Sequence, residues 1–318
     1  MSTNLATPQR NVASVSLAAS ASDPEGFAAE LGESFERFGF AIISDHGIPA
    51  DLIARAEEKA KAYFALPEEV KRSYHVQGGG GARGYTPFGI ETAKGATHFD
   101  LKEFWHVGRE LPAGHRFGDS MPPNVWPDEV ESFHDTFLEL YDTFDRTGLK
   151  ILKAIARFLK IDEDYFIDTV RDGNSVMRLL HYPPIVGEPG SNVRAGAHED
   201  INTITLLLGA EEAGLELLTR DGRWIPVSSM PGELVVNIGD MLQRLTNGLL
   251  RSTTHRVVNP PPERRSRSRY SMPFFLHFRS DFCIEALPGT VPPGEQPKWP
   301  PITANDYLQE RLREIKLA

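Results

Sequence analysis

The second half of the chain alternates short apolar segments with turn-forming residues, and this pattern limits the possible fold more than any other feature. From about residue 173 onward, segments rich in Val, Ile, Leu, Thr and Phe are separated by Gly, Pro, Asn or Asp. They read SVMRLLHYPP, NTITLLLG, GLELLTRDGRWIPV, ELVVNIGD, STTHRVVNPPP and RYSMPFFLHF. Such segments predict strands, and the Asp221-Gly222 step predicts a hairpin. Many short strands with little helix between them favour a sandwich or jelly roll over a doubly wound parallel sheet.

The first half of the chain is mainly helical in pattern. Asp23 followed by Pro24 is typical of a helix start, because Asp caps the free amide groups and Pro fits the first helical position. Pro49 stands near the start of a second predicted helix. Residues 127–160 carry apolar side chains at intervals of three to four, which predicts a long helix packed against a sheet. A last helix is predicted in NDYLQERLREIKL near the C-terminus.

Short strands and one long loop connect these helices. The segment RNVASVSLAASASD is poor in Leu, so we interpret it as an edge strand plus a loop and not as a signal peptide. GFAIISDHGIP predicts a buried strand and a turn, and DLKEFWHVG predicts another strand. Between them, residues 76–99 contain four consecutive Gly residues and predict a long surface loop.

Together these elements predict an α+β fold with a double-stranded β-helix, or jelly roll, flanked by helices. We expect a mainly helical N-terminal part with edge strands over residues 1–172. The jelly-roll core is expected over 173–290, and a C-terminal tail with a helix over 291–318. The 318 residues are enough for one large domain or two modest ones.

Composition excludes several classes of protein. The formal net charge of −10 argues against a chain-wide surface for nucleic acid or anionic membrane. A single cysteine, Cys283, rules out an intrachain disulfide framework and a Cys-rich zinc site, and is compatible with a reducing cytoplasm. No apolar run is long enough to predict a transmembrane helix.

Three residues in the strand-rich half form a candidate metal site. His198 and Asp200 stand two residues apart directly before an apolar strand, so an extended backbone would point both to one face. Asn202 occupies the position where a helical zinc protease motif would need its second His. His255, in the strand-like STTHRVVNP, supplies a third ligand type. Two His and one carboxylate make the facial triad typical of non-haem Fe(II) oxygenases, and Glu199 should then point away from the metal.

The last apolar strand carries a candidate anion-binding pair. Arg269 and Ser271 are two residues apart in RYSMPFFLHF and would share one face of the strand. A buried Arg needs an anionic partner, and its planar guanidinium suits bidentate capture of a carboxylate. Arg264 with Ser266 also reads R-x-S, so the register is open. We favour Arg269 because the apolar strand follows it immediately.

The chain at this point resembles the Fe(II)/2-oxoglutarate-dependent dioxygenase superfamily, in its isopenicillin N synthase-like branch. The motifs GFAIISDHGIP, HYPP, AHEDINTITLLLG, VVNIGDMLQRLTNGLLRSTTHRV and RYSMPFF follow one another in the family's order. The resemblance covers nearly the whole chain. It implies an oxidoreductase that uses Fe(II), 2-oxoglutarate and O2, acts on a small molecule, and releases succinate and CO2. From the composition we expect it in the cytoplasm. Nucleic-acid and membrane partners are not expected.

The resemblance also assigns roles residue by residue. It implies that His198, Asp200 and His255 are the iron ligands, and that Arg269, Ser271 and Tyr182 contact 2-oxoglutarate. Candidate substrate contacts come from the Gly-rich loop and from two strand-like segments: Arg83, Tyr85, Phe88, Lys102, Phe104 and Arg178.

The same centre leaves alternatives to hydroxylation open. An oxidase or ethylene-forming type of enzyme could use this scaffold with another co-substrate stoichiometry. A non-catalytic metal-binding module is a third hypothesis, although such a module has no need of both the metal triad and the Arg. The sequence gives no key to the prime substrate.

Overall fold

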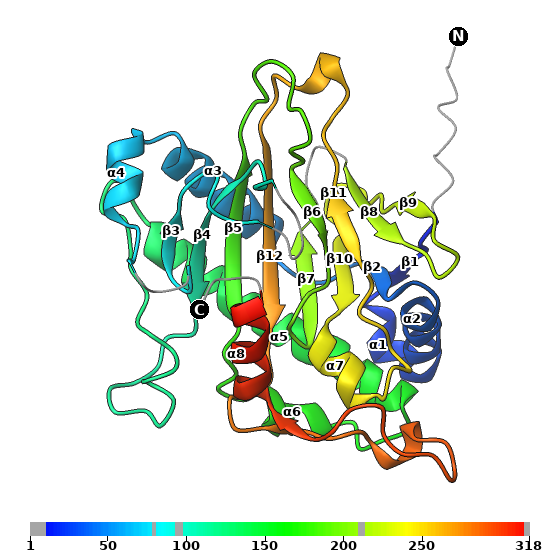
Figure 1. The fold of residues 1–318 in the computed structure, drawn as a ribbon. Helices are drawn as coiled ribbons and strands as arrows, with labels where there is room; N and C mark the ends of the chain where they lie inside the picture. The colour runs from blue at the N-terminus through cyan, green and yellow to red at the C-terminus, as the bar shows by residue number, and fades with distance from the viewer. Residues whose placement is uncertain (1–10, 78–80, 93–97, 209–213, 315–318) are drawn as a thin grey trace.

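Two facing sheets form the centre of the computed structural model, which describes residues 11–77, 81–92, 98–208 and 214–314 (Figure 1). The larger sheet has the strand order β1-β2-β10-β7-β12-β5-β4-β3. In that order, the strands are Ser14–Ser16, Phe40–Ser44, Leu234–Ile238, Ile204–Leu208, Arg269–Leu276, Val176–Tyr182, Glu103–Gly108 and Gly84–Thr86. Its strand pairs are antiparallel except that β1 runs parallel to β2.

The smaller sheet has the order β6-β11-β8-β9. Its strands are Ala195–His198, His255–Val257, Leu215–Leu218 and Trp224–Pro226. The predicted hairpin is confirmed, because β8 pairs antiparallel with β9 around Gly222, whose φ of 80° is a left-handed conformation that Gly adopts without strain. A further pair, β13 (Cys283–Ile284) with β14 (Ile302–Thr303), lies near the C-terminal helix. The jelly roll expected from the sequence is therefore present.

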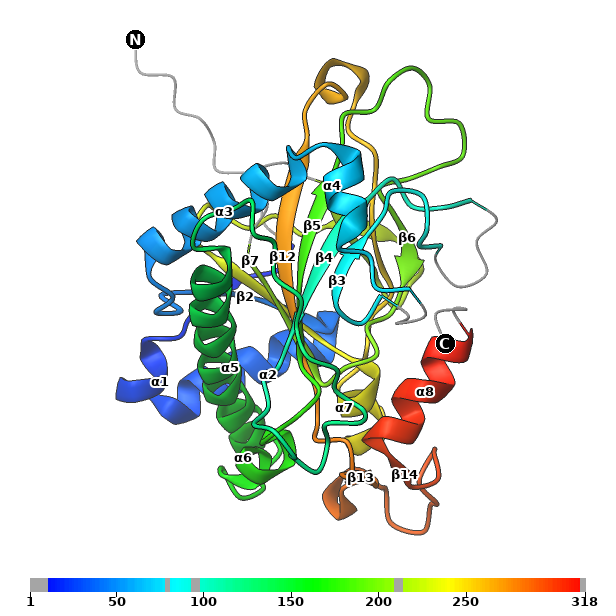
Figure 2. The same ribbon diagram turned by 90° about the vertical axis from the view of Figure 1, so that its left-hand side faces the viewer.

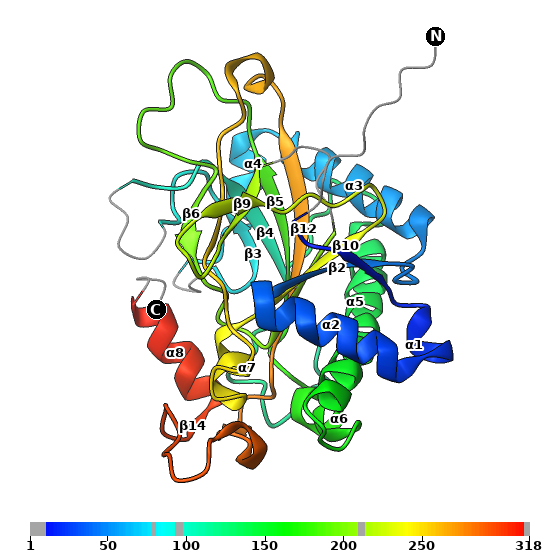
Figure 3. The ribbon, with the colours of Figure 1, turned by 90° about the vertical axis from the view of Figure 1, so that its right-hand side faces the viewer.

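The helices lie mainly against the outer face of the larger sheet. Figures 2 and 3 show α2, α3 and α5 on one side of this sheet and the smaller sheet on the other. The helices are α1 Ala19–Ser22, α2 Pro24–Phe38, α3 Ala50–Phe64, α4 Glu68–Ser73, α5 Phe133–Phe158, α6 Tyr165–Val170, α7 Asp240–Leu245 and α8 Ala304–Glu314. Two short 3-10 turns, Pro262–Arg264 and Pro288–Thr290, complete the regular structure of the described residues.

Alternation along the strands sorts apolar side chains into two cores. In β10, Leu234 and Val236 pack with the helices in the first core, whereas Val235 faces the second core between the two sheets. The same split places Ile43 in the first core and Ile42 in the second. Because successive side chains of a strand point to opposite faces, a strand buried on both sides reads as a continuous apolar run. The second core includes Tyr182 and also Phe40, whose ring centre lies 5.4 Å from that of His255.

Helix starts follow the expected chemistry, with one boundary shifted. The Asp23 carboxylate accepts a hydrogen bond from the Gly26 amide at 2.9 Å, as predicted for the cap of α2. The long helix expected over 127–160 begins only at Phe133, because Ser132 has a left-handed φ of 58° that interrupts the helical backbone.

Some local structure differs from the expectation. The Gly-rich stretch 76–99 contains the short strand β3, so the prediction of an uninterrupted loop there was wrong. Gly84 begins this strand at φ 69°, and a Cβ on it would lie 2.6 Å from the Tyr74 carbonyl oxygen. The helices α1, α4, α6 and α7 have four to six residues each, too short to show a periodic apolar pattern.

The N-terminal part of the chain contributes strands to the same sheet as the second half. β2 pairs with β10, and β4 pairs with β5. The division of the chain at residues 172 and 290 stays a prediction. Among the residues described, no helix has the length and apolar character required to cross a lipid bilayer.

Candidate metal centre and co-substrate site

Strand pairing brings the two histidines of the predicted triad together. His198 ends β6, and His255 begins β11 directly opposite it in the antiparallel pair. The centres of the two imidazole rings lie 4.4 Å apart. Asp200 lies just beyond the end of β6, in the bend that leads to β7, and not within an extended strand as the sequence suggested. The three residues therefore converge through a cross-strand pair and a bend.

The ligand atoms of these three residues form a compact set. The Asp200 Oδ1 atom lies 3.9 Å from His198 Nε2 and 3.8 Å from His255 Nε2. One ligand atom from each residue lies within 4.8 Å of the other two. Asp200 and His255 are buried, whereas 36% of the His198 side chain is exposed. Two imidazole nitrogens and one carboxylate oxygen at this spacing fit a single divalent metal ion of the iron type.

Hydrogen bonds hold the carboxylate of Asp200 in one orientation. Its Oδ2 atom accepts hydrogen bonds from the Thr205 hydroxyl at 2.5 Å and from Asn237 Nδ2 at 2.7 Å. The Oδ1 atom is thereby left to face the histidines. Sequence reasoning missed both partners, although Asn237 in the apolar run VVNI is a buried polar residue that requires a partner.

The histidine rings present the nitrogens that a metal needs. Nδ1 of His198 bonds to the Gly196 carbonyl at 2.8 Å, and Nδ1 of His255 bonds to the Thr253 carbonyl at 3.0 Å. A carbonyl accepts, so each Nδ1 carries the hydrogen and each Nε2 keeps its lone pair. Partial burial and the neighbouring His255 lower the pKa of His198 to about 4, which favours the neutral ring.

The charge on Asp200 is also stabilised. Burial raises the pKa of this carboxyl group, but the His255 and His198 rings and the hydrogen bonds from Thr205 and Asn237 outweigh burial and lower the pKa. The group is therefore ionised at neutral pH. Glu199 points elsewhere, as predicted, because it is exposed and accepts a hydrogen bond from the Thr254 hydroxyl at 2.8 Å.

The candidate 2-oxoglutarate residues lie side by side on neighbouring strands. Arg269 and Ser271 are buried on β12, and an Arg269 Nη1 hydrogen donates to the Ser271 hydroxyl at 3.2 Å. Tyr182 is the antiparallel partner of Arg269, whose guanidinium carbon lies 5.1 Å from the Tyr182 ring centre. Arg264, the alternative in the sequence, lies in a 3-10 turn outside the strand. Arg269, and not Arg264, therefore lies on the strand next to Tyr182.

A buried cluster of charges lies between the candidate metal site and the start of β4. The Lys102 ammonium lies 3.1 Å from Glu91 and 2.9 Å from Asp100, and Arg178 lies 3.2 Å from Glu91. The other carboxylate oxygen of Asp100 accepts from the Gly196 amide, two residues before His198. Burial raises the pKa of Glu91, but Arg178 and Lys102 lower it further, so the carboxylate is charged.

Two aromatic rings flank Arg178 in this cluster. Its guanidinium carbon lies 4.1 Å from the Phe104 ring centre and 5.4 Å from that of Phe275. Its Nε donates to His106 Nε2 at 2.6 Å, and burial followed by the charge of Arg178 lowers the pKa of His106 well below its usual value. The predicted residues Lys102, Phe104 and Arg178 are thus brought together, whereas sequence reasoning missed Glu91, at the end of the Gly-rich stretch.

The other three candidate substrate residues make different contacts. Tyr85 belongs to the helix-covered first core, where its hydroxyl contacts Glu103. Arg83 is buried and donates to the carbonyl groups of Ala82 and Pro122. Phe88 is 39% exposed and packs on Phe99. The roles of Arg83, Tyr85 and Phe88 as substrate contacts therefore stay predictions.

Comparison with known families shows to which family the chain belongs. Residues 11–129 match a family described as the N-terminal part of non-haem dioxygenases in morphine synthesis. Residues 173–278 match the 2OG-Fe(II) oxygenase superfamily. The chain belongs to the 2OG-Fe(II) oxygenase superfamily. As an oxygenase of this superfamily, it is an oxidoreductase that uses Fe(II) and 2-oxoglutarate.

Individual relatives agree with this membership. A 2-oxoglutarate-Fe(II) type oxidoreductase of Emericella nidulans is 35% identical, and the alignment covers 90% of this chain and 83% of the relative. A crystal structure of a 2OG-Fe(II) oxygenase family protein from Caulobacter crescentus is 57% identical with a TM-score of 0.89, covering 96% of this chain and 99% of that one. A Neurospora crassa protein in complex with alpha-KG and thymine is 29% identical with a TM-score of 0.85, covering 95% of this chain and 96% of that one.

Proposed function

We propose that this oxygenase hydroxylates a small polar molecule, with Fe(II) held by His198, Asp200 and His255. The convergence of two Nε2 atoms and the Asp200 Oδ1 atom within 4.8 Å carries the proposal. Backbone carbonyls fix both imidazole tautomers, and Thr205 with Asn237 fixes the carboxylate. Three protein ligands leave the remaining coordination positions of an octahedral iron for co-substrate and O2.

Arg269, Ser271 and Tyr182 are proposed to hold 2-oxoglutarate. A buried guanidinium beside a hydroxyl can bind the distal carboxylate of a dicarboxylate through charge-assisted hydrogen bonds. The Tyr182 ring lies against Arg269 and limits its freedom to turn away. In this arrangement, the protein supplies two anchors for one molecule, the metal at one end and Arg269 at the other.

The charged cluster beside β4 supports a polar substrate with no net charge. Glu91 and Asp100 offset Lys102 and Arg178, while His106 is neutral, so the cluster has no excess charge to offer. The Nη2 group of Arg178 makes no hydrogen bond to any described residue, and 15% of this side chain is exposed. We propose that Nη2 donates to a substrate oxygen while Phe104 and Phe275 limit the position of the guanidinium.

The chemistry balances as the conversion of R–H, O2 and 2-oxoglutarate into R–OH, succinate and CO2. O2 is the oxidant, and iron held by His198, Asp200 and His255 would activate it for this step. The chain contributes positioning: Arg269 fixes the co-substrate, and the Arg178 cluster fixes the substrate C–H group near the metal. The apolar second core around Phe104, Leu180 and Tyr182 keeps water from the reacting groups.

The compartment and the organisation of the chain are also proposals. Cys283 is the sole cysteine, which is compatible with work in a reducing cytoplasm. We propose that residues 173–290 hold the metal and co-substrate, while residues 1–172 add the β4 side of the substrate site.

Succinate formation tests the proposed function. The purified chain is incubated with Fe(II), 2-oxoglutarate and O2 against a library of small polar molecules, including the amino acids and nucleobases. We expect succinate above background, accompanied by a product that is 16 mass units heavier than its substrate. Absence of both succinate and 2-oxoglutarate binding under all conditions would contradict the proposal. A product that is two mass units lighter would indicate desaturation instead of hydroxylation.

Glu199, the residue after His198, offers a matched control. His198→Ala should abolish turnover and leave the thermal unfolding of the metal-free chain within a few degrees of wild type. Glu199→Gln changes a charge one residue away that points out of the site, and should retain turnover. Equal loss in both variants would show that the segment tolerates no change at all, and would remove the support for His198 as a ligand.

A further inference from the structure

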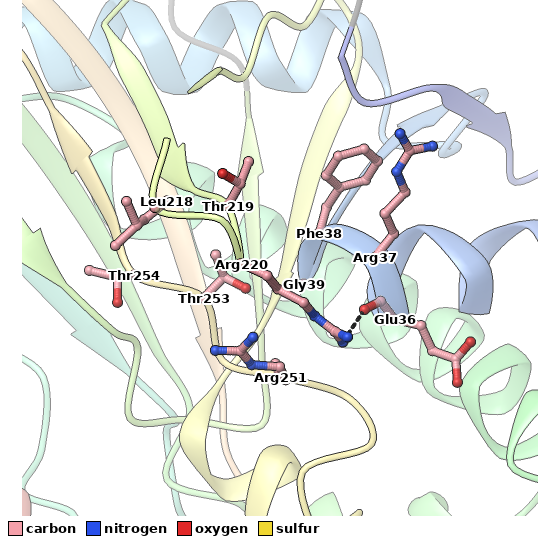
Figure 4. Close-up of a pocket in the computed structure, with 11 residues that line it drawn as sticks. Glu36, Arg37, Phe38, Gly39, Leu218, Thr219, Arg220, Arg251, Thr253 and Thr254 are labelled. Atoms are coloured by element: carbon pink, nitrogen blue, oxygen red, sulfur yellow. Dashed lines mark hydrogen bonds between the residues drawn. The ribbon is translucent and has the colours of Figure 1, made fainter. Parts of the chain in front are cut away.

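A surface cavity of about 230 Å³ lies on another side of the smaller sheet, outside the proposed catalytic site (Figure 4). Its walls come from the C-terminal end of α2, from the turn between β8 and β9, and from residues 251–254. None of the residues proposed to bind iron, 2-oxoglutarate or substrate lines it. The cavity is therefore a separate feature of the fold.

Three arginines from different elements line this cavity. Arg37 lies in the last turn of α2, Arg220 lies in the β8–β9 turn, and Arg251 lies in the segment before β11. Within the described part of the chain, none of the three forms an ion pair with a carboxylate. This is unexpected in a chain with 44 acidic and 34 basic residues, where most arginines have an acidic neighbour available. Positive charge is thus concentrated locally in an acidic protein.

The one acidic residue of the lining does not neutralise this charge. Arg220 donates a hydrogen bond to the backbone carbonyl of Glu36 at 2.7 Å, and not to its carboxylate. Figure 4 shows the Glu36 carboxylate turned away from the guanidinium groups of Arg220 and Arg251. Arg37 lies 4.7 Å from the ring centre of Phe38 and is exposed. The carbonyl contact also places Arg220 at the cavity wall.

A close backbone approach shapes the opposite wall. A Cβ on Gly39 would lie 2.2 Å from the Thr253 hydroxyl oxygen and 2.6 Å from the Arg251 carbonyl oxygen. The absence of that atom lets residues 251–254 pack against the end of α2. The Thr253 hydroxyl makes no hydrogen bond to any described residue, so it is a donor available to a ligand.

We propose that this cavity binds the phosphate group of a small molecule. Guanidinium groups bind phosphate oxygens bidentately, and a hydroxyl donor adds a further bond. Arg220 on one wall and Arg251 with Thr253 on another supply the donors, and a phosphate offers them more acceptor oxygens than a carboxylate does. The ligand is inorganic phosphate itself or a small phosphate monoester, which present the same chemistry.

The segment that lines this cavity continues directly into the proposed metal site. His255 directly follows residues 251–254, and its Nδ1 donates a hydrogen bond to the Thr253 carbonyl. Thr254 also bonds to Glu199, between the other two proposed ligands. A phosphate bound by Arg251 and Thr253 thus stabilises the segment that orients His255. Binding itself does not depend on the proposed function, because none of its donors is a metal or co-substrate residue.

Calorimetric titration tests the proposal. The full chain, loaded with Fe(II) and 2-oxoglutarate without oxygen, is titrated with inorganic phosphate, glycerol 3-phosphate and succinate. We expect saturable phosphate binding that Arg251→Gln and Arg220→Gln each weaken about tenfold or more, from the loss of a charge-assisted hydrogen bond. Tighter binding of glycerol 3-phosphate than of phosphate would identify a monoester as the ligand, and the reverse would identify free phosphate.

Arg223→Gln provides the matched control. This arginine is exposed on the same hairpin but pairs with Asp221 at 2.7 Å and does not line the cavity. Its replacement should leave phosphate affinity unchanged. The proposal is overturned if phosphate does not saturate, if Arg251→Gln binds as tightly as wild type, or if succinate binds equally well. Binding that persists in Arg251→Gln would place the phosphate on the iron instead.

Discussion

Replacement of Thr205 by Val tests whether the orientation of Asp200 sets the metal affinity. Thr205 is buried, and its hydroxyl donates to Asp200 Oδ2 at 2.5 Å. Val has nearly the same shape, so the change keeps the packing and removes the hydroxyl, which also accepts a hydrogen bond from Asn202 Nδ2 at 3.2 Å. Asp200 would then retain only the bond from Asn237 on that oxygen. Its carboxylate becomes freer to rotate Oδ1 away from the histidines.

The expected loss follows from the strength of this bond. A hydrogen bond to a charged acceptor contributes about 1.5–3 kcal/mol. Because about 1.4 kcal/mol corresponds to a tenfold change in affinity, complete loss would weaken metal binding about 10-fold to 100-fold. The remaining Asn237 bond limits rotation of the carboxylate. We therefore expect a loss at the lower end, about 10-fold to 30-fold.

Metal titration without oxygen measures this effect, and the chain offers a close control. Fe(II) affinity is determined by equilibrium dialysis for wild type, Thr205→Val and Thr203→Val. Thr203 is equally buried two residues away, but its hydroxyl has no hydrogen-bond partner among the described residues. Thr203→Val should leave the Fe(II) affinity unchanged, and stability should stay the same or rise slightly.

Two outcomes would refute the reasoning. If Thr205→Val binds Fe(II) as tightly as Thr203→Val, the hydroxyl bond does not position the carboxylate. If both variants lose affinity equally, the loss comes from disturbed packing at the start of β7 and not from the hydrogen bond.

Three further predictions concern the co-substrate, the core and the pH dependence. Arg269→Gln should raise the KM for 2-oxoglutarate about 100-fold, because a buried charge pair would lose one partner. Arg264→Gln should leave this KM unchanged, and equal effects of the two variants in a succinate assay would contradict the assignment. Gly148→Ala in α5 places a Cβ 2.4 Å from a Leu276 methyl carbon and should lower the free energy of unfolding in urea by about 1–3 kcal/mol; unchanged stability would show that the helix and β12 separate easily. Burial lowers the pKa of His277 to about 4. As the pH falls from 6.5 to 4, the unfolded chain therefore takes up a proton on His277 that the folded chain does not, and the free energy of unfolding falls by up to about 3 kcal/mol. His277→Gln should remove that part of the fall in urea titrations at several pH values, and parallel curves would contradict the prediction.

The strands could be predicted from the sequence because their apolar residue pattern matches the burial of their side chains. Alternation in SVMRLLHYPP and the hairpin step Asp221-Gly222 identified strands that the structure contains. The pairing of His198 with His255 could be predicted only as proximity, since register depends on contacts between segments far apart in the chain. The short helices could not be predicted, because one or two turns carry no period.

The candidate substrate residues show where the sequence stops being informative. Phe104 and Lys102 were placed near the site by their strand, and the structure puts them with Arg178. Tyr85 was expected there as well, but it lies on the other face of the sheet, because the parity of β3 depends on its pairing with β4. Glu91 gave no signal in the sequence, since an acidic residue within a Gly-rich stretch is ordinarily exposed to solvent.

The edge position of β6 has a consequence for metal exchange. β6 forms one edge of the smaller sheet, so His198 is 36% exposed while His255, on the inner strand β11, is 9% exposed. An edge strand can fray without opening the sheet. We therefore expect His198 to be the last of the three residues to bind a metal ion and the first to release it, while His255 and Asp200 stay in place. We expect the residence time of the metal, measured by its transfer to a chelator, to follow the opening rate of β6 and not the unfolding rate of the chain. Equal chelator-transfer and global unfolding rates would contradict this.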